Sequence, residues 1–321
     1  MTSTALTTSA PGAPPGAPSG ADATPHRRHR GLGALGRLRV VALGLLGLLT
    51  VAALWEAYKA LAPEDGVLIG ETRVLPRTTD LAMPHVWDMV RRLFEPTTSI
   101  AEEALWQTVA AAALVSLGIA AVGWVVGTTV GLLLAVAMAR VRVVEWGLLP
   151  WIVLSQTVPL IAFAPIVRSW GSRIEIGSWE WPPWLSVAVI ASYLAFFPVA
   201  VGALRGLQSH SAIHADLMRA YAAGWWATLL RVRIPSAVPY LLPALRLGAA
   251  SAVVGTVVAE VSTGYLDGIG RLLVSYAGQA SGDPAKAWAP IFGAIALGLV
   301  AGAVVTLIGV LLRPYRRGEA P

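Results

Sequence analysis

Six long, almost uninterrupted apolar stretches constrain the fold of this chain more than any other feature. About 20 such residues are enough for a helix to cross the hydrocarbon core of a bilayer. Of the 321 residues, 56% are hydrophobic and only 13% are charged, too few charges to coat a water-soluble globule of this size. The sequence therefore predicts an all-α integral membrane protein with about six transmembrane helices. The expected spans are 38–61, 105–138, 144–167, 184–204, 237–261 and 287–312.

The first apolar stretch follows a basic segment rich in Ala, Pro and Gly. Residues 1–35 are expected to form a disordered cytoplasmic tail, because this composition cannot bury a core. A secretory or twin-arginine signal cleaved near Ala60-Leu61-Ala62 is the alternative. The spanning length and the later spans favour a retained first helix, 38–61. An external loop, 62–103, and a core transmembrane domain, 104–315, are expected to follow.

The third expected span contains three prolines, Pro150, Pro159 and Pro165. Each proline removes one backbone donor, so we expect a kinked helix whose freed carbonyls are satisfied by neighbouring helices. On the second span, glycines recur every four residues, at Gly123, Gly127 and Gly131. That spacing predicts a smooth face for close helix contact.

The placement of basic residues predicts the orientation. With the N-terminus inside, the inner segments hold 14 of the 24 basic residues but only four of the 18 acidic ones. Positively charged loops stay on the cytoplasmic side. The sequence therefore predicts a multi-pass protein of the cell membrane with both termini in the cytoplasm. The formal charge of +6 fits contact with anionic lipid better than with nucleic acid.

A cytoplasmic segment between the fourth and fifth spans, 209–239, is too long for a simple turn. It is expected to be helical up to Arg233 and to stop at Pro235. Apolar residues recur in it at steps of three or four, which predicts one apolar face. They are Leu217, Tyr221, Trp225, Leu229 and Val232, widened by Trp226 and Leu230. An amphipathic helix lying on the inner leaflet is one interpretation.

The order of residues in this segment resembles the cytoplasmic EAA loop of ABC importer permeases. Asp216-Leu217-Met218 stands at the acid-small-small position of that loop, Ala222 at its glycine, and Ile234-Pro235 at its apolar-Pro pair. Ala222 and the larger Leu217 and Met218 depart from the pattern. Because a turn at this point favours glycine, which adopts positive φ readily, Gly224 is the residue expected to take the positive φ.

Four further motifs extend the resemblance over residues 100–315. Together they resemble the nitrate/sulfonate/taurine group of bacterial ABC importer permeases, which implies the type I permease fold. The motifs are Leu154-Ser155-Gln156-Thr157-Val158-Pro159-Leu160-Ile161-Ala162-Phe163-Ala164-Pro165, Phe196-Phe197-Pro198, Ala259-Glu260 and Gly268-Ile269-Gly270.

The resemblance implies a permease homodimer in the bilayer, a separate ABC ATPase subunit and an external solute-binding protein. The chain has no GxxxxGK[ST] phosphate loop, so ATP hydrolysis is expected on the ATPase and no cofactor on this chain. In the family, the cytoplasmic loop docks in a groove of the ATPase; Tyr221, Trp225 and Trp226 are the expected apolar knob. Asp216 is expected to cap the helix start or to pair with a partner arginine. The predicted coupling residues are Asp216, Leu217, Met218, Tyr221, Ala222, Gly224, Trp225, Trp226 and Pro235.

The translocation path is less readable from the sequence. Glu260 is a charged residue in the fifth span, and charges in a membrane are costly enough to suggest function. Snorkelling to the interface is the alternative for Glu260 and for Arg246. Thr256 and Ser262 are further candidates for the path.

No catalytic constellation is apparent in the sequence. His210 and His214 stand at i, i+4 without a third clear ligand, so no metal site is expected. A stand-alone channel or secondary transporter and a membrane-embedded enzyme are the rival hypotheses. The resemblance implies a small anion such as nitrate, a sulfonate or taurine as the solute. A thiamine-pyrimidine precursor or riboflavin remains an alternative.

Overall fold

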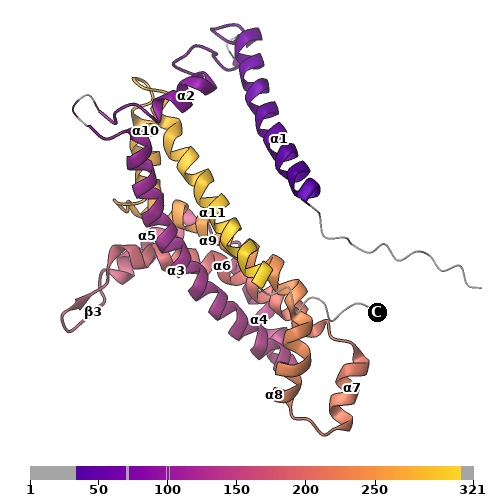
Figure 1. Ribbon diagram of the computed structural model, residues 1–321. Helices are drawn as coiled ribbons and strands as arrows, with labels where there is room; N and C mark the ends of the chain where they lie inside the picture. Colours follow the sequence, from indigo (N-terminus) through magenta and orange to yellow (C-terminus); the bar gives the residue numbers. More distant parts are fainter. Residues whose placement is uncertain (1–33, 70–71, 99, 101, 312–321) are drawn as a thin grey trace, which may run out of the picture. The chain divides into compact units, whose positions relative to one another are not determined.

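The computed structural model describes residues 34–69, 72–98, 100 and 102–311. The tail expected at 1–35 lies outside the described residues except for its last two positions, as do residues 312–321. The chain divides into two compact units, Met1–Leu54 and Trp55–Pro321. Helices make up most of the described residues (Figure 1), which confirms the all-α prediction.

Among the described residues, five helices are long and apolar enough to cross a membrane, and the number is six if a bent pair of helices is counted as one span. The connections between helices also contain two short antiparallel hairpins, β1–β2 and β3–β4, which the sequence pattern did not predict. The helices are α1 (Ala34–Leu61), α2 (Val86–Arg92), α3 (Leu105–Arg140), α4 (Arg142–Ser155), α5 (Leu160–Gly171), α6 (Pro183–Gln208), α7 (Ala212–Ala220), α8 (Trp225–Thr228), α9 (Ile234–Thr263), α10 (Ile269–Gly278) and α11 (Ala289–Leu311). A π-helical turn, η1 (Leu229–Arg233), and a 3₁₀ turn, η2 (Lys286–Trp288), precede α9 and α11, and the strands are β1 (Val67–Ile69), β2 (Thr72–Leu75), β3 (Glu175–Ile176) and β4 (Trp179–Glu180).

The helices α3, α6 and α9 form the packed centre of the second unit. Gly123, Gly127 and Gly131 of α3 face α6 so closely that a methyl group would not fit. A Cβ on Gly127 would lie 2.6 Å from the Ser192 carbonyl oxygen, and one on Gly131 would lie 2.7 Å from the Phe196 carbonyl oxygen. The close helix contact predicted from the glycine spacing is confirmed.

The proline-rich third span is broken between α4 and α5, which meet at an angle of 102°. Pro159 stands at the N-cap of α5, where it has no N–H to donate back to Ser155. The Ser155 carbonyl oxygen accepts instead from the N–H of Val158 at 3.3 Å and from the hydroxyl of Tyr193 on α6. Both the kink and the satisfaction of a freed carbonyl by a neighbouring helix are therefore confirmed.

The two halves of the broken span pack at different depths. On α4, Ile152 packs with Ala135 of α3 and Ala203 of α6. Both partners lie near the C-terminal ends of their helices, α3 before the α3–α4 turn and α6 before the 209–239 segment. On α5, Ala164 packs with Ile119 of α3 and Ile190 of α6. On α6 these two levels are 13 residues apart, about 20 Å of helix rise. The pair α4–α5 therefore traverses the bundle as one span.

The helical path through Pro235 differs from the expectation. Helix α8 runs through η1 into α9 without a stop, giving one apolar helix from Trp225 to Thr263. The N–H of Ile234 donates to the Leu229 carbonyl, five residues back. This wider π turn interrupts the regular backbone hydrogen bonds of the helix just before Pro235. The proline ring and its missing N–H are therefore accommodated. The predicted stop at Pro235 is wrong for this reason.

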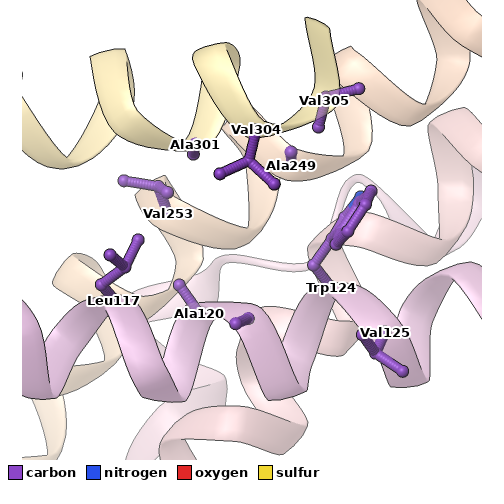
Figure 2. A pocket seen from close by; sticks show the side chains of 10 residues that line it. Leu117, Ala120, Trp124, Val125, Ala249, Val253, Ala301, Val304 and Val305 are labelled. Carbon is purple, nitrogen blue, oxygen red and sulfur yellow. The ribbon is translucent and has the colours of Figure 1, made fainter. Parts of the chain in front are cut away.

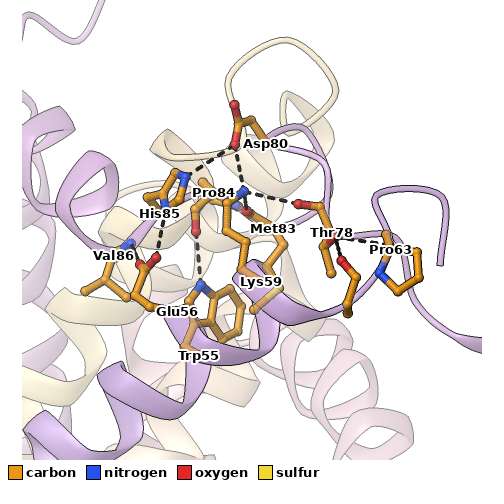
Figure 3. A network of polar contacts seen from close by, with 11 residues as sticks. Trp55, Glu56, Lys59, Pro63, Thr78, Asp80, Met83, Pro84, His85 and Val86 are labelled. Atoms are coloured by element: carbon orange, nitrogen blue, oxygen red, sulfur yellow. Dashed lines mark hydrogen bonds and ion pairs between the residues drawn. The ribbon is translucent and has the colours of Figure 1, made fainter.

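A polar network ties the 62–86 connection to the C-terminal end of α1 (Figure 3). Lys59 is only 7% exposed, and its Nζ donates to the Thr78 carbonyl and to Asp80 Oδ1, at 3.1 and 2.6 Å. Glu56 Oε1 accepts from the N–H of Val86, the first residue of α2, at 2.7 Å. The network satisfies both charged groups and sets the start of α2.

Candidate functional site

The predicted coupling segment folds as two short helices, α7 and α8, joined by a tight turn at residues 221–224. No residue of α7 or α8 is buried. Apolar side chains nevertheless gather there: Tyr221 is 77% and Trp226 is 61% exposed. We call the exposed apolar set the coupling surface; it consists of Ile213, Leu217, Tyr221, Trp226 and Leu230.

The three aromatic residues predicted as a knob differ in their surroundings. Tyr221 and Trp226 are exposed. Trp225 is half-buried and packs against the inner core cluster, and the guanidinium of Arg140, at the end of α3, lies 4.5 Å from the centre of its ring. This geometry suits a cation–π contact. Trp225 thus connects α8 to α3, whereas its two aromatic neighbours are free to meet a partner.

Asp216 lies in the middle of α7 and forms an ion pair with Arg219, one turn later. The N-cap of α7 is Ser211, and that of α8 is Gly224. Asp216 therefore caps neither helix, and the capping role expected for it is wrong. Its pairing with a partner arginine stays a prediction.

The turn after α7 is made by Ala222 itself. Ala222 has a φ of +52°, whereas Gly224 has a φ of −64°. The expectation that Gly224 would supply the positive φ is therefore wrong. The left-handed conformation therefore falls on the residue that stands at the glycine position of the EAA pattern. In this turn the N–H groups of Ala222 and Ala223 donate to the carbonyl oxygens of Arg219 and Met218.

The remaining predicted coupling residues take intermediate positions. Met218 and Pro235 are half-buried, while Gly224 is exposed. Their roles in coupling stay predictions.

Glu260 is fully buried, so snorkelling to the interface does not describe it. Its Oε1 accepts from Ser116 Oγ of α3 at 2.7 Å, and its Oε2 accepts from the N–H of Gly270 at 2.8 Å. Ser116 Oγ in turn accepts from the N–H of Ile269 at 2.9 Å. A carboxylate at a helix N-terminus is favourable, and here it joins α3, α9 and the start of α10.

The Ala259-Glu260 and Gly268-Ile269-Gly270 motifs meet at this point. A Cβ at Gly268 would overlap the Glu260 carboxylate, and one at Gly270 would lie 2.6 Å from Glu260 Cβ. The glycines therefore allow α10 to approach the carboxylate. Sequence reasoning missed Ser116, because a single serine in an apolar helix has no distinguishing pattern.

The other residues proposed for the path are placed as follows. Thr256 is fully buried, and no hydrogen bond is recorded for its hydroxyl among the described residues. The hydroxyl of Ser262 donates to the Val258 carbonyl of its own helix. Arg246 is exposed. A role of Glu260, Thr256 or Ser262 in translocation stays a prediction.

An apolar cavity of about 260 Å³ lies between α3, α9 and α11 (Figure 2). Its wall includes Leu117, Val253 and Val304. Trp124 also lines it, but its ring N–H is used by the Leu245 carbonyl at 3.2 Å. Such a wall is poorly suited to a polar solute. Over the described ranges, no group of three metal-ligating side chains occurs, and the absence of metal and cofactor stays a prediction.

Comparison with known proteins decides the family. The profile of the binding-protein-dependent transport system inner membrane component matches residues 127–317, more than half of the chain. The chain belongs to this family. The match covers α4 to α11 and includes the coupling segment and the Glu260 site.

Relatives of this permease carry names from the same class. It is 27% identical over 208 residues to the formylaminopyrimidine transport permease protein ThiX of Halalkalibacterium halodurans, a match that covers 64% of this chain and 77% of the relative. It is 27% identical over 155 residues to a Bacillus subtilis protein named as an aliphatic sulfonates transport permease, SsuC, covering 48% and 52%. A Haemophilus influenzae protein named as an ABC transporter permease is 29% identical over 157 residues, covering 47% and 58%. The resemblance to ABC permeases of the sulfonate group is confirmed, and the chain is a transport permease of the membrane.

Proposed function

We propose that this permease is the membrane-spanning subunit of an importer that a separate ATPase drives through the coupling surface. The observation that carries the proposal is the exposure of Tyr221 and Trp226 on a segment with no buried residue. Single exposed apolar side chains are common on surfaces, but several large ones exposed along one short segment favour an interaction site. Trp225, held by Arg140, provides the stiff base that force transmission needs.

An orientation with both termini in the cytoplasm supports this assignment. The α4–α5 pair counts as one crossing because its halves pack at the two levels of the bundle. Six crossings bring the two ends of the chain to the same side. The basic residues of the 209–239 segment favour the cytoplasmic side for the coupling surface, the side on which an ATPase works.

The solute is proposed to be a small polar organic molecule delivered by an external binding protein. The names of ThiX and SsuC point to formylaminopyrimidine and aliphatic sulfonates for those relatives. A pyrimidine-like or sulfonate-like solute is therefore the first class to assay. We further propose that two copies of the chain enclose the path, as the importer resemblance implies.

The test is a mild-detergent purification of the tagged chain from native membranes. Tyr221→Ala and Trp226→Ala are compared with wild type and with Trp170→Ala, an exposed tryptophan at the far end of α5. Co-purification of an ATPase with wild type and Trp170→Ala, reduced about tenfold or more in the other two, supports coupling through this surface.

Two outcomes would contradict the proposal. Equal ATPase recovery with all variants would remove the coupling surface from the contact. A chain that purifies alone, and that carries solute into liposomes without nucleotide, would establish a stand-alone transporter.

A further inference from the structure

The break between α4 and α5 lies at the middle depth of the bundle. It follows Ile152, which packs at the inner level, and precedes Ala164, which packs at the outer level. Tyr193, whose hydroxyl holds the Ser155 carbonyl, stands near the midpoint of α6. Residues 156–159, the break segment, are therefore non-helical backbone in the region where lipid tails surround the protein.

The break segment exposes polar side chains at this depth. Thr157 is exposed and Gln156 is half-buried. Gln156 Nε2 donates to Ser155 Oγ at 3.3 Å, and the structure records no further partner for its carboxamide in the described part of the chain. The Thr157 hydroxyl donates to the Leu154 carbonyl at 2.8 Å, which leaves its oxygen able to accept.

The backbone of the break segment is also short of partners. Among the described residues, no recorded hydrogen bond is accepted by the carbonyl oxygens of Gln156, Thr157 and Val158. The first bond of α5 runs from the N–H of Ala162 to the Pro159 carbonyl. The α4–α5 junction thus presents a row of free acceptors.

Lipid tails cannot cover such a segment. Each unsatisfied backbone group in hydrocarbon costs several kcal/mol, and irregular backbone at membrane depth occurs only where it is buried in protein or lines a water-filled cavity. In this chain, α6 covers Ser155 through Tyr193 but leaves Thr157 exposed. Water or a passing solute can donate hydrogen bonds to the free carbonyl oxygens of the break segment, and neither requires a row of protein donors opposite it.

We propose that the break segment, with Gln156 and Thr157 at its centre, lines the translocation path and contacts the passing solute. This inference rests on the proposed function for the direction of transport. The contact of the break segment with water, which we call the wet wall, does not depend on an ATPase. Carbonyl, carboxamide and hydroxyl oxygens dominate the segment, and no charged residue lies in it. The segment therefore suits small polar solutes that bear N–H or O–H donors, and suits bare anions less.

The chain contains no cysteine, so thiol labelling of a variant reports only on the single cysteine that is introduced. Gln156→Cys and Thr157→Cys are compared with Leu299→Cys, which is 70% exposed near the middle of the unbroken helix α11. Inside-out and right-side-out vesicles containing the full-length chain are treated with two hydrophilic methanethiosulfonates, one bearing trimethylammonium and one bearing sulfonate. Labelled protein is counted by mass spectrometry.

We expect both break-segment cysteines to react at least about tenfold faster than Leu299→Cys from one or both sides, because the thiolate is the reacting form and hydrocarbon suppresses its formation. The ammonium reagent should be favoured over the sulfonate reagent at Thr157→Cys more than it is for free cysteine in solution. Equal or greater preference for the sulfonate reagent would overturn the proposed solute class.

Rates as slow as that of Leu299→Cys from both sides would overturn the wet wall. Efficient oxidation of Thr157→Cys to a disulfide between two copies, with no labelling, would instead assign the segment to a subunit interface. Loss of ATPase co-purification, measured separately, bears on the proposed function alone. Thr157→Val, which keeps the shape and removes the hydroxyl, should fold as wild type and lower solute uptake severalfold, whereas Thr129→Val, which removes an exposed hydroxyl bonded within α3, should not.

Discussion

Ala222 illustrates how one residue can carry a backbone conformation that its side chain disfavours. The left-handed region costs a non-glycine residue about 1–2 kcal/mol, and Ala222 occupies it with a φ of +52°. The cost is borne because α7 must turn back before α8 begins.

Replacing Ala222 by Gly is expected to stabilise the α7–α8 turn by about 1 kcal/mol, since glycine adopts positive φ without a Cβ clash. Slower hydrogen exchange of residues 212–228 would measure it. Ala220→Gly is the matched control: Ala220 ends α7 as a helical residue, so glycine there should speed exchange. Faster exchange in Ala222→Gly would contradict the assigned turn.

Ser116 is the second residue with a local consequence. Ser116→Ala removes one donor to the buried Glu260 carboxylate and the acceptor for the Ile269 N–H. Leaving buried polar groups unpaired costs about 1–3 kcal/mol. The apparent Tm in detergent should therefore fall. Ser192→Ala is the control, because among the described residues the Ser192 hydroxyl bonds only to the Val189 carbonyl of its own helix. An equal fall in both variants would argue against a special role for Ser116.

At the scale of elements, the glycine face of α3 decides how closely two spans approach. Gly127 contacts α6, whereas Gly118 of the same helix has nothing within 4 Å of the position that an added methyl group would take. The two glycines thus share a helix and a residue type but differ in surroundings.

Gly127→Ala is expected to destabilise the bundle by roughly 1–3 kcal/mol, since the methyl group must displace α6 backbone. Gly118→Ala should be neutral or stabilise by up to about 1 kcal/mol through helix propensity. Thermal unfolding of the two variants in one detergent tests the contrast. Equal stability of the two would show that α3 and α6 are not in close contact at Gly127.

The long helix from Trp225 to Thr263 relates the two sites to each other. Its 39 residues correspond to about 58 Å of rise. Trp226 of the coupling surface lies at its first turn, and Glu260, which contacts the start of α10, lies at its last. One continuous helical element therefore connects the two sites.

At the scale of the whole molecule, the 62–86 connection is expected to respond to acid through Asp80. The hydrogen bond and charge of Lys59 hold the pKa of Asp80 below its usual value. A lowered carboxyl pKa contributes stability above the unfolded-state value of about 3.9, and that stability is lost as the pH falls through the folded-state value. Hydrogen exchange of residues 62–85, corrected for its intrinsic pH dependence, should therefore accelerate below about pH 4. Asp80→Asn should exchange faster at pH 7 and lack this acid step; an unchanged step would assign it to another group.

The sequence by itself predicted an all-helical protein of about six apolar spans, a kink at the prolines, the close glycine contact and the family. These features depend on local composition and periodicity, which act within one helix or between neighbours on its face. Only the tertiary structure decided that Trp225 packs inward on Arg140, that Glu260 is enclosed by Ser116 and α10, and that the helix passes through Pro235. Each depends on groups distant in the chain or on a shift in the hydrogen-bond ladder, so spacing along the sequence does not reveal which partner a side chain meets.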